Sequence, residues 1–102
     1  MPTVGDLLLE SLRIQAEAEE ACLDFIRTDL ELCLTFARVA ETAYGLGHLE
    51  HADQAVARAE KGYSDMLRFF SKAKRLTPGI EQELQSEFKE LRDRLDRVQR
   101  LG

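Results

Sequence analysis

The two histidines, His48 and His51, are the residues whose types point most directly to chemistry. They lie next to Glu50 and Asp53, so metal-ligating side chains gather in this short stretch. A zinc-protease helix needs two histidines four residues apart, and a carboxylate-bridged di-iron bundle needs a glutamate three residues before each histidine. His48 and His51 are three residues apart and have no such glutamate. We therefore predict neither a metal site nor a cofactor, and retain His48 and His51 only as candidate ligands.

A phosphotransfer site is a second interpretation of the same histidines, because small helical bundles can carry a phosphoryl group on a histidine that faces solvent. The carboxylates of Glu50 and Asp53 beside His51 would repel that group. A small metal-binding or phosphotransfer bundle that uses His48 and His51 is therefore the alternative function and not the main prediction.

Nucleophilic catalysis has no recognisable motif in the sequence. None of the serines stands in a Gly-x-Ser-x-Gly turn, and no glycine-rich phosphate loop follows a strand. Cys22 and Cys33 are 11 residues apart, which is ~16 Å along a helix axis, whereas a disulfide needs Cα atoms within about 7 Å. We predict that both cysteines are reduced core residues and that the protein is not an enzyme.

Composition and charge limit the class of protein. The chain has 102 residues, of which 44% are hydrophobic and 32% charged, and this suits a single domain over residues 1–102. The 14 basic and 19 acidic residues give a net charge of −5, which disfavours nucleic acid and membranes as partners. The apolar run at residues 7–9 is too short for a membrane span or a secretory leader, so we expect a cytoplasmic protein.

Helices must position these residues, because apolar side chains recur at spacings of three and four along the chain. Glycines at 45 and 47 and the triplet Thr77-Pro78-Gly79 divide the chain into three segments. Thr77 is a suitable helix N-cap, and Pro78 suits the first helical turn. We predict an all-α fold, an antiparallel up-down bundle of three long helices at approximately residues 6–44, 48–76 and 78–101.

The second and third segments each carry a heptad seam, which is typical of packed helices. The second seam consists of Leu49, Ala52, Val56, Ala59, Tyr63, Met66, Phe70 and Ala73. The third seam consists of Ile80, Leu84, Phe88, Leu91, Leu95 and Val98. A basic run near the end of the second segment complements the helix dipole: Arg68, Lys72, Lys74 and Arg75. On the third segment we expect three acid–base pairs four residues apart: Glu90 with Arg94, Asp93 with Arg97, and Asp96 with Arg100.

The first segment is the longest, and its seam consists of Ile26, Leu30, Cys33, Ala37, Ala40 and Tyr44. As one helix it would be ~58 Å long, against ~43 Å for the second segment, so its N-terminal end would extend beyond the bundle from about residue 16. Alternatively, the capping-box pattern of Thr28 and Glu31 breaks the segment into 6–26 and 29–44, which gives four helices. Both alternatives are open at this point.

The first glycine turn is flanked by small and apolar residues at regular spacing, namely Phe36, Val39, Ala40, Ala43, Gly47, Ala52, Val56 and Ala59. In this pattern, residues 36–59 resemble a single tetratricopeptide repeat hairpin. The resemblance implies two antiparallel helices that approach closely near the turn. It also implies the adaptor role that is typical of that family.

These observations favour a non-enzymatic protein–protein interaction or scaffold domain. It would act by self-association, as a homodimer, or by capturing a partner helix. The predicted contact residues are the apolar side chains of the extended end: Leu8, Leu9, Leu12 and Ile14. In the four-helix alternative, these side chains pack inside a monomer instead.

Overall fold

The computed structural model describes residues 3–73 and 76–102, and all regular secondary structure in this part of the chain is helical. The helices are α1 (Val4–Gly45), α2 (Leu49–Lys72) and α3 (Pro78–Gln99). The prediction of an all-helical chain with three helices is confirmed. The molecule is elongated, at 67 × 25 × 15 Å, and its radius of gyration of 18.3 Å exceeds the value of about 13 Å typical of a compact chain of this length.

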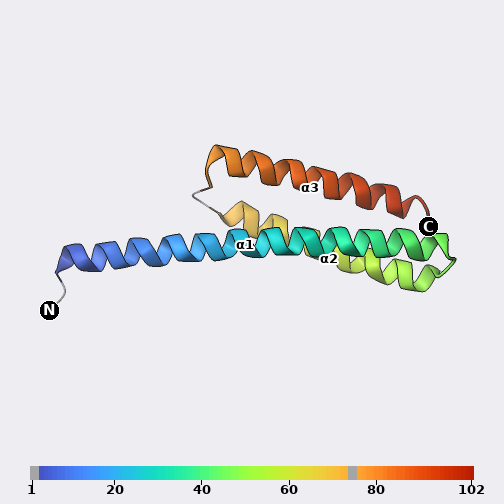
Figure 1. The fold of residues 1–102 in the computed structure, drawn as a ribbon, viewed down its shortest axis with the longest axis horizontal. Coiled ribbons are helices and arrows are strands. Elements are labelled where there is room, and N and C mark those ends of the chain that lie inside the picture. Colours follow the sequence, from blue (N-terminus) through green and yellow to red (C-terminus); the bar gives the residue numbers. More distant parts are fainter. Residues whose placement is uncertain (1–2, 74–75) are drawn as a thin grey trace.

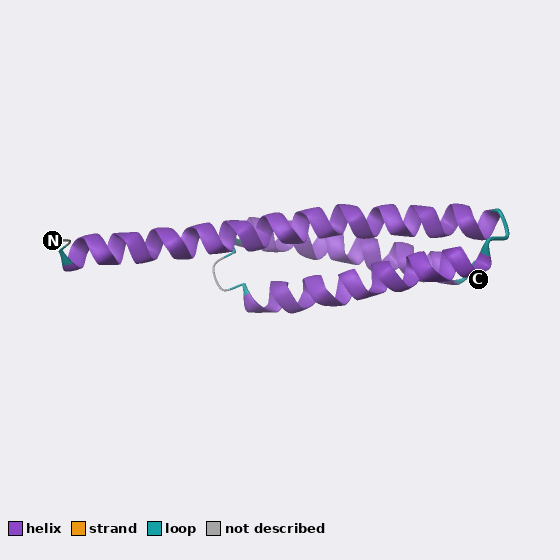
Figure 2. Ribbon diagram, turned by 90° about the horizontal axis from the view of Figure 1, so that it is seen from below, coloured by secondary structure: helices purple, strands orange, loops and turns teal. Residues whose placement is uncertain are grey.

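The elongated shape comes from α1. Figure 1 shows α1 running through the whole molecule, whereas α2 and α3 lie beside its C-terminal part only. Figure 2, turned by 90°, shows the same isolated N-terminal end of α1. The C-terminus of the chain lies near the α1–α2 turn, where Gly102 approaches the ring of Tyr44.

α1 is one continuous helix of 42 residues, so the four-helix alternative with a break near Thr28 is wrong. The heptad seam passes Thr28 without a change of phase, and this residue is exposed on the helix surface. The capping box that starts α1 is formed by Thr3 and Asp6 instead. The Asp6 backbone N–H donates to Thr3 Oγ1 at 3.2 Å, and the Thr3 N–H donates to Asp6 Oδ2 at 3.2 Å.

The turn between α1 and α2 depends on Gly47. This residue has a φ of 78°, in the left-handed region that glycine adopts without steric cost. The backbone N–H of His48 then donates to the Ala43 carbonyl at 2.8 Å, which satisfies one of the free carbonyls at the end of α1. The turn is therefore tight, and α2 begins at Leu49.

α2 ends at Lys72, and the prediction that it continues to residue 76 is wrong. Ala73 has already left the helix, at φ −73° and ψ 115°, because a helix that continued to Leu76 would leave only Thr77 to connect it to α3. Lys72 lies in the last turn as expected, while Lys74 and Arg75 lie outside the described residues. The N-cap prediction for α3 is confirmed, since Thr77 Oγ1 accepts from the Ile80 N–H at 3.3 Å.

Alanines dominate the core near the α1–α2 turn. Six of them are at most 5% exposed: Ala37, Ala40 and Ala43 on α1, and Ala52, Ala55 and Ala59 on α2. Larger side chains fill the core elsewhere, among them Met66 on α2 and Leu84, Phe88, Leu91 and Leu95 on α3. The residues of the predicted seams are therefore buried or half-buried, except that Leu49 is 57% exposed because it stands at the very start of α2, beside the turn.

Candidate interaction surface

The first 15 residues of α1, residues 4–18, are exposed, and we call them the projecting segment. At 1.5 Å per residue α1 is ~63 Å long and α2 is ~36 Å long, so α2 cannot reach this end of α1. The apolar side chains of the projecting segment are 51–75% exposed: Val4, Leu7, Leu8, Leu9, Leu12 and Ile14. All four predicted contact residues thus lie on an uncovered helix end.

The predicted contact residues do not share one face of α1. Leu12 and Leu9 precede the buried residues Ile26 and Leu30 by whole heptads, so they continue the core seam beyond the bundle. Leu8 flanks this seam. Ile14 lies about 200° around the helix from Leu12, on the opposite side.

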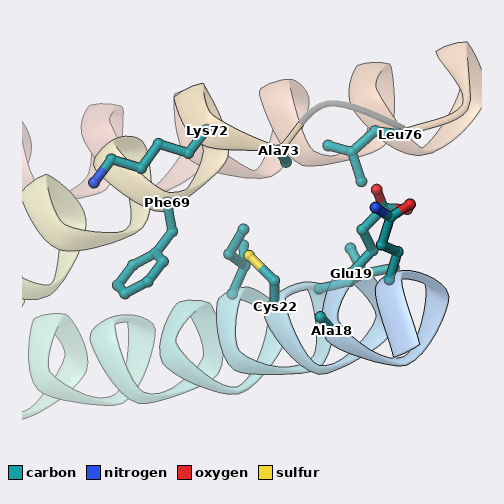
Figure 3. A pocket seen from close by; sticks show the side chains of 10 residues that line it. Ala18, Glu19, Cys22, Phe69, Lys72, Ala73 and Leu76 are labelled. Atoms are coloured by element: carbon teal, nitrogen blue, oxygen red, sulfur yellow. The ribbon is translucent and has the colours of Figure 1, made fainter. Parts of the chain in front are cut away.

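An apolar cleft of 380 Å³ lies where the projecting segment meets the bundle. One wall of the cleft is formed by α1 between Gln15 and Ile26, and the other wall is formed by the end of α2 together with Leu76. Figure 3 shows Phe69 pointing from α2 toward α1 and Lys72 lying along α2, with the sulfur of Cys22 between the helices and Leu76 near Glu19. The cleft is therefore apolar inside, with Lys72 and Glu19 among its lining residues.

The exposed leucines lead directly into this cleft. Leu8 is followed at intervals of seven by Gln15 and Cys22, both of which line the cleft. Leu12 is followed in the same way by Glu19 and Ile26. The projecting segment and the cleft therefore form one continuous surface along the core-facing side of α1.

The two cysteines have different environments, and neither forms a disulfide. Cys33 is buried, as predicted, against Gly62 of α2. Burial, followed by the nearby carboxylates of Asp29 and Asp65, raises the pKa of the Cys33 thiol to about 11. This thiol therefore stays protonated and unreactive at neutral pH. Cys22 is only half-buried, because it lines the cleft.

His48 and His51 lie at the start of α2 and are both exposed. His48 occupies the N-cap position without a side-chain cap hydrogen bond, and Asp53 accepts a hydrogen bond of 2.6 Å from the Tyr44 hydroxyl instead of joining the histidines. Among residues 3–73 and 76–102, no three or more His, Cys, Asp or Glu side chains are grouped so that they could hold a metal ion. The histidines instead line a shallow hollow of 420 Å³ with Val39, Thr42 and Leu46.

The charged residues of α3 pair differently from the prediction. Asp96 accepts hydrogen bonds from Arg92, at 3.1 Å from Nε and 2.8 Å from Nη2, and not from Arg100. Arg92 also reaches across to Glu60 of α2, with Nη1 2.8 Å from Oε2. Arg92 and Asp96 are also four residues apart, but the base comes first, whereas the predicted pairs place the acid first. Glu60 lies on another helix, and spacing within one helix does not predict such a pair.

Sequence reasoning missed a second set of exposed apolar residues on α1. Phe25, Leu32 and Val39 are 37–48% exposed and lie seven residues apart, away from the core seam. Their regular spacing was the available signal. The seam through Ile26 alone is enough to predict a packed helix, so this second spacing adds nothing to the helix prediction.

Comparison of the chain with protein-family models, curated proteins and solved structures found no match. The resemblance of residues 36–59 to a tetratricopeptide repeat hairpin therefore stays a prediction. Within the described residues, no helix has the length and apolar character needed to cross a bilayer.

Proposed function

We propose that the protein is a non-enzymatic interaction or scaffold domain that self-associates into a homodimer through the projecting segment. The observation that carries this proposal is the exposure of leucines that continue the core seam of α1, with Leu8 60% and Leu12 51% exposed. Most of the stability of a helix in a protein comes from packing of its apolar face, and the exposed leucines of this segment lack such packing, so a second helix would stabilise the segment. In the proposal, the three helices form an up-down antiparallel bundle, and the segment extends from one end of it.

The charges of the projecting segment support a second copy as the partner. If two segments pair in opposite directions with Leu9 of one copy opposite Leu12 of the other, residue 4 faces residue 17, and the segments overlap along their length. Asp6 and Arg13 occupy the same flanking heptad position, which meets its own counterpart in an antiparallel pair. Asp6 of each copy then faces Arg13 of the other. Such a two-fold contact is self-complementary, as a homodimer requires.

The test is the double substitution Leu8→Asp and Leu12→Asp, with mass measured by light scattering and helicity by circular dichroism. We expect wild type at twice the monomer mass, with the dimer fraction falling on dilution, and the variant at monomer mass with most of its helicity retained. Retention follows because both side chains lie outside the core. The matched control adds the same charge on the exposed surface of α3, by Gln82→Asp and Gln85→Asp, and should remain dimeric.

Three outcomes would contradict the proposal: a monomeric wild type at all concentrations, a dimeric double variant, or a large loss of helicity in that variant. The last result would mean that Leu8 and Leu12 pack inside the monomer. Reductant is present throughout, so that a disulfide through the half-buried Cys22 does not imitate the dimer.

A further inference from the structure

The outer side of α1 carries a second heptad stripe, which we call the outer stripe. It runs from Leu7 to Val39 at alternating spacings of four and three, and its large members are Leu7, Ile14, Phe25, Leu32 and Val39. The positions between them hold only Ser, Thr and Ala. All positions of the outer stripe are exposed, and the five large side chains are 37–58% exposed.

The outer stripe contains no charge, although α1 is rich in charged residues. An exposed helix face normally carries charged and polar side chains, and unbroken alternation of three and four is the pattern of a packed seam. The outer stripe lies about 160° around α1 from the core seam, so the bundle itself does not cover it. Phe25 touches α2, with the centre of its ring 4.9 Å from the centre of the Phe69 ring, and Val39 lines the hollow beside His48 and His51.

The flank of the outer stripe indicates what kind of helix would fit. Four exposed acids follow one edge at intervals of seven: Glu10, Glu17, Asp24 and Glu31. In a coiled-coil pair, this flanking position lies next to the charged flank of the partner helix. A second copy of α1 packed here in the opposite direction would bring acid against acid along most of this edge. A partner with basic residues on its flank would neutralise it.

We propose that the outer stripe of α1 binds an amphipathic helix of a partner protein, with an apolar seam flanked on one side by Lys or Arg at intervals of seven. The apolar seam provides the buried contact, and the acidic edge selects the partner and its orientation. This site is separate from the proposed dimer contact, because it uses the opposite side of α1 and continues along the bundle. One chain can therefore associate with a second copy and bind a partner helix at the same time.

The test uses two synthetic helical peptides of about four heptads. Both carry the same leucine and isoleucine seam, and one has lysine and the other glutamate at the flanking positions. Binding to the full chain is measured by calorimetry at low and at physiological salt. We expect the lysine peptide to bind at least tenfold more tightly than the glutamate peptide, with the difference decreasing as salt rises.

Leu32→Asp combined with Val39→Asp tests the apolar contact. We expect these substitutions to weaken binding of the lysine peptide more than tenfold, although two added acids would strengthen a purely electrostatic attraction. Both side chains are exposed and distant from the projecting segment, so folding and dimer mass should not change. Gln82→Asp with Gln85→Asp on α3 adds the same charge and should bind like wild type.

Charge reversal tests the selection rule. Glu17→Lys with Asp24→Lys leaves two acids and two bases along this edge, so the preference for the lysine peptide should be largely abolished. Equal binding of both peptides to wild type, unchanged binding to the Leu32 and Val39 variant, or an unchanged preference after charge reversal would each overturn the proposal. Dimer mass is measured separately, so failure of peptide binding and failure of self-association give different results.

Discussion

Arg92 is the side chain that connects α3 to α2 by charge. Its guanidinium donates to both oxygens of Glu60 and to Asp96, and it lies 5.1 Å from the centre of the Tyr63 ring. Gln99 donates a further hydrogen bond of 2.7 Å to Glu60. The hydrogen bonds from Arg92 hold the pKa of Glu60 below its ordinary value of 4.5, although burial opposes this shift. The charged form of Glu60 therefore stabilises the fold.

Replacing Arg92 with Met should lower the free energy of unfolding at pH 7 by about 1 kcal/mol, because the ion pair is only partly buried. The folded-state pKa of Glu60 is lowered, so this contribution is present above pH 4.5 and is lost as the pH falls through the lowered pKa. Urea unfolding at several pH values measures the difference between the proteins. Arg97→Met, at an exposed position of the same helix, is the control and should change little. A constant difference down to pH 2 would contradict this prediction.

Asp29 has the opposite effect on stability. Burial at the α1–α2 contact, followed by repulsion from Asp65, raises its pKa above 3.8. The folded state therefore binds this proton more readily than the unfolded chain, and the carboxylate destabilises the fold at neutral pH.

Asp29→Asn should raise Tm at pH 7 by about 1–4 °C, by removing a charge that repels Asp65. The gain should shrink as the pH falls through the raised pKa and vanish below 3.8, where wild-type Asp29 is protonated in both states. Thermal unfolding followed by circular dichroism at pH 7 and pH 3 provides the comparison. Asp24→Asn, at an exposed position five residues away, should leave Tm almost unchanged. A lower Tm for Asp29→Asn at pH 7 would show that the carboxylate is stabilising.

At the scale of elements, α1 and α2 approach each other closely at Gly62. A Cβ atom added there would lie 2.5 Å from Cys33 Sγ, which is too close for any real contact. The thiol belongs to a buried side chain, so it has little room to move.

Gly62→Ala should therefore destabilise the protein by about 1–3 kcal/mol, despite a gain in helix propensity of about 1 kcal/mol. Adding Cys33→Ala should recover part of the loss, because it removes the sulfur atom that the new methyl group would meet. Denaturant unfolding of both single variants and the double variant gives the coupling free energy between positions 33 and 62. Gly45→Ala, where nothing lies within 4 Å, is the matched glycine control. If the effects of the two substitutions were additive, α1 and α2 would be able to move apart at position 62 to make room for the methyl group, and the prediction would be wrong.

The elements were more predictable than the contacts between them. Heptad spacing through Ile26 and Leu84, the turn glycine Gly47 and the N-cap Thr77 are local signals, and each leads to the observed helix or turn. The spacing of apolar residues did not predict the end of α2 at Lys72, because that end depends on the length of chain needed to connect α2 to α3. The same holds for the pair formed by Arg92 and Glu60 and for the cleft beside Cys22, because each requires two helices to be placed side by side.

At the scale of the whole molecule, the projecting segment extends from the bundle and contributes no buried residue to its core. The buried residues of α1 begin at Ile26, and every residue from 4 to 18 is exposed. Removal of residues 1–17 should therefore leave Tm of the monomer unit within about 2–4 °C of wild type when both are compared at dilutions where wild type is monomeric. Light scattering should show the shortened chain as a monomer at all concentrations. A large loss of stability would mean that the segment folds back onto the bundle.

The uninterrupted course of α1 would also fix the distance between the two bundles of the proposed dimer. Between Gly5 and Gly45 the helix contains neither glycine nor proline, the residues that most often kink a helix. Two chains that overlap along residues 4–18 would hold their bundles ~22 Å apart in a rod of ~110 Å, given a single-chain length of 67 Å. Such a dimer is a spacer of fixed length, which presents two identical outer stripes facing away from their shared centre.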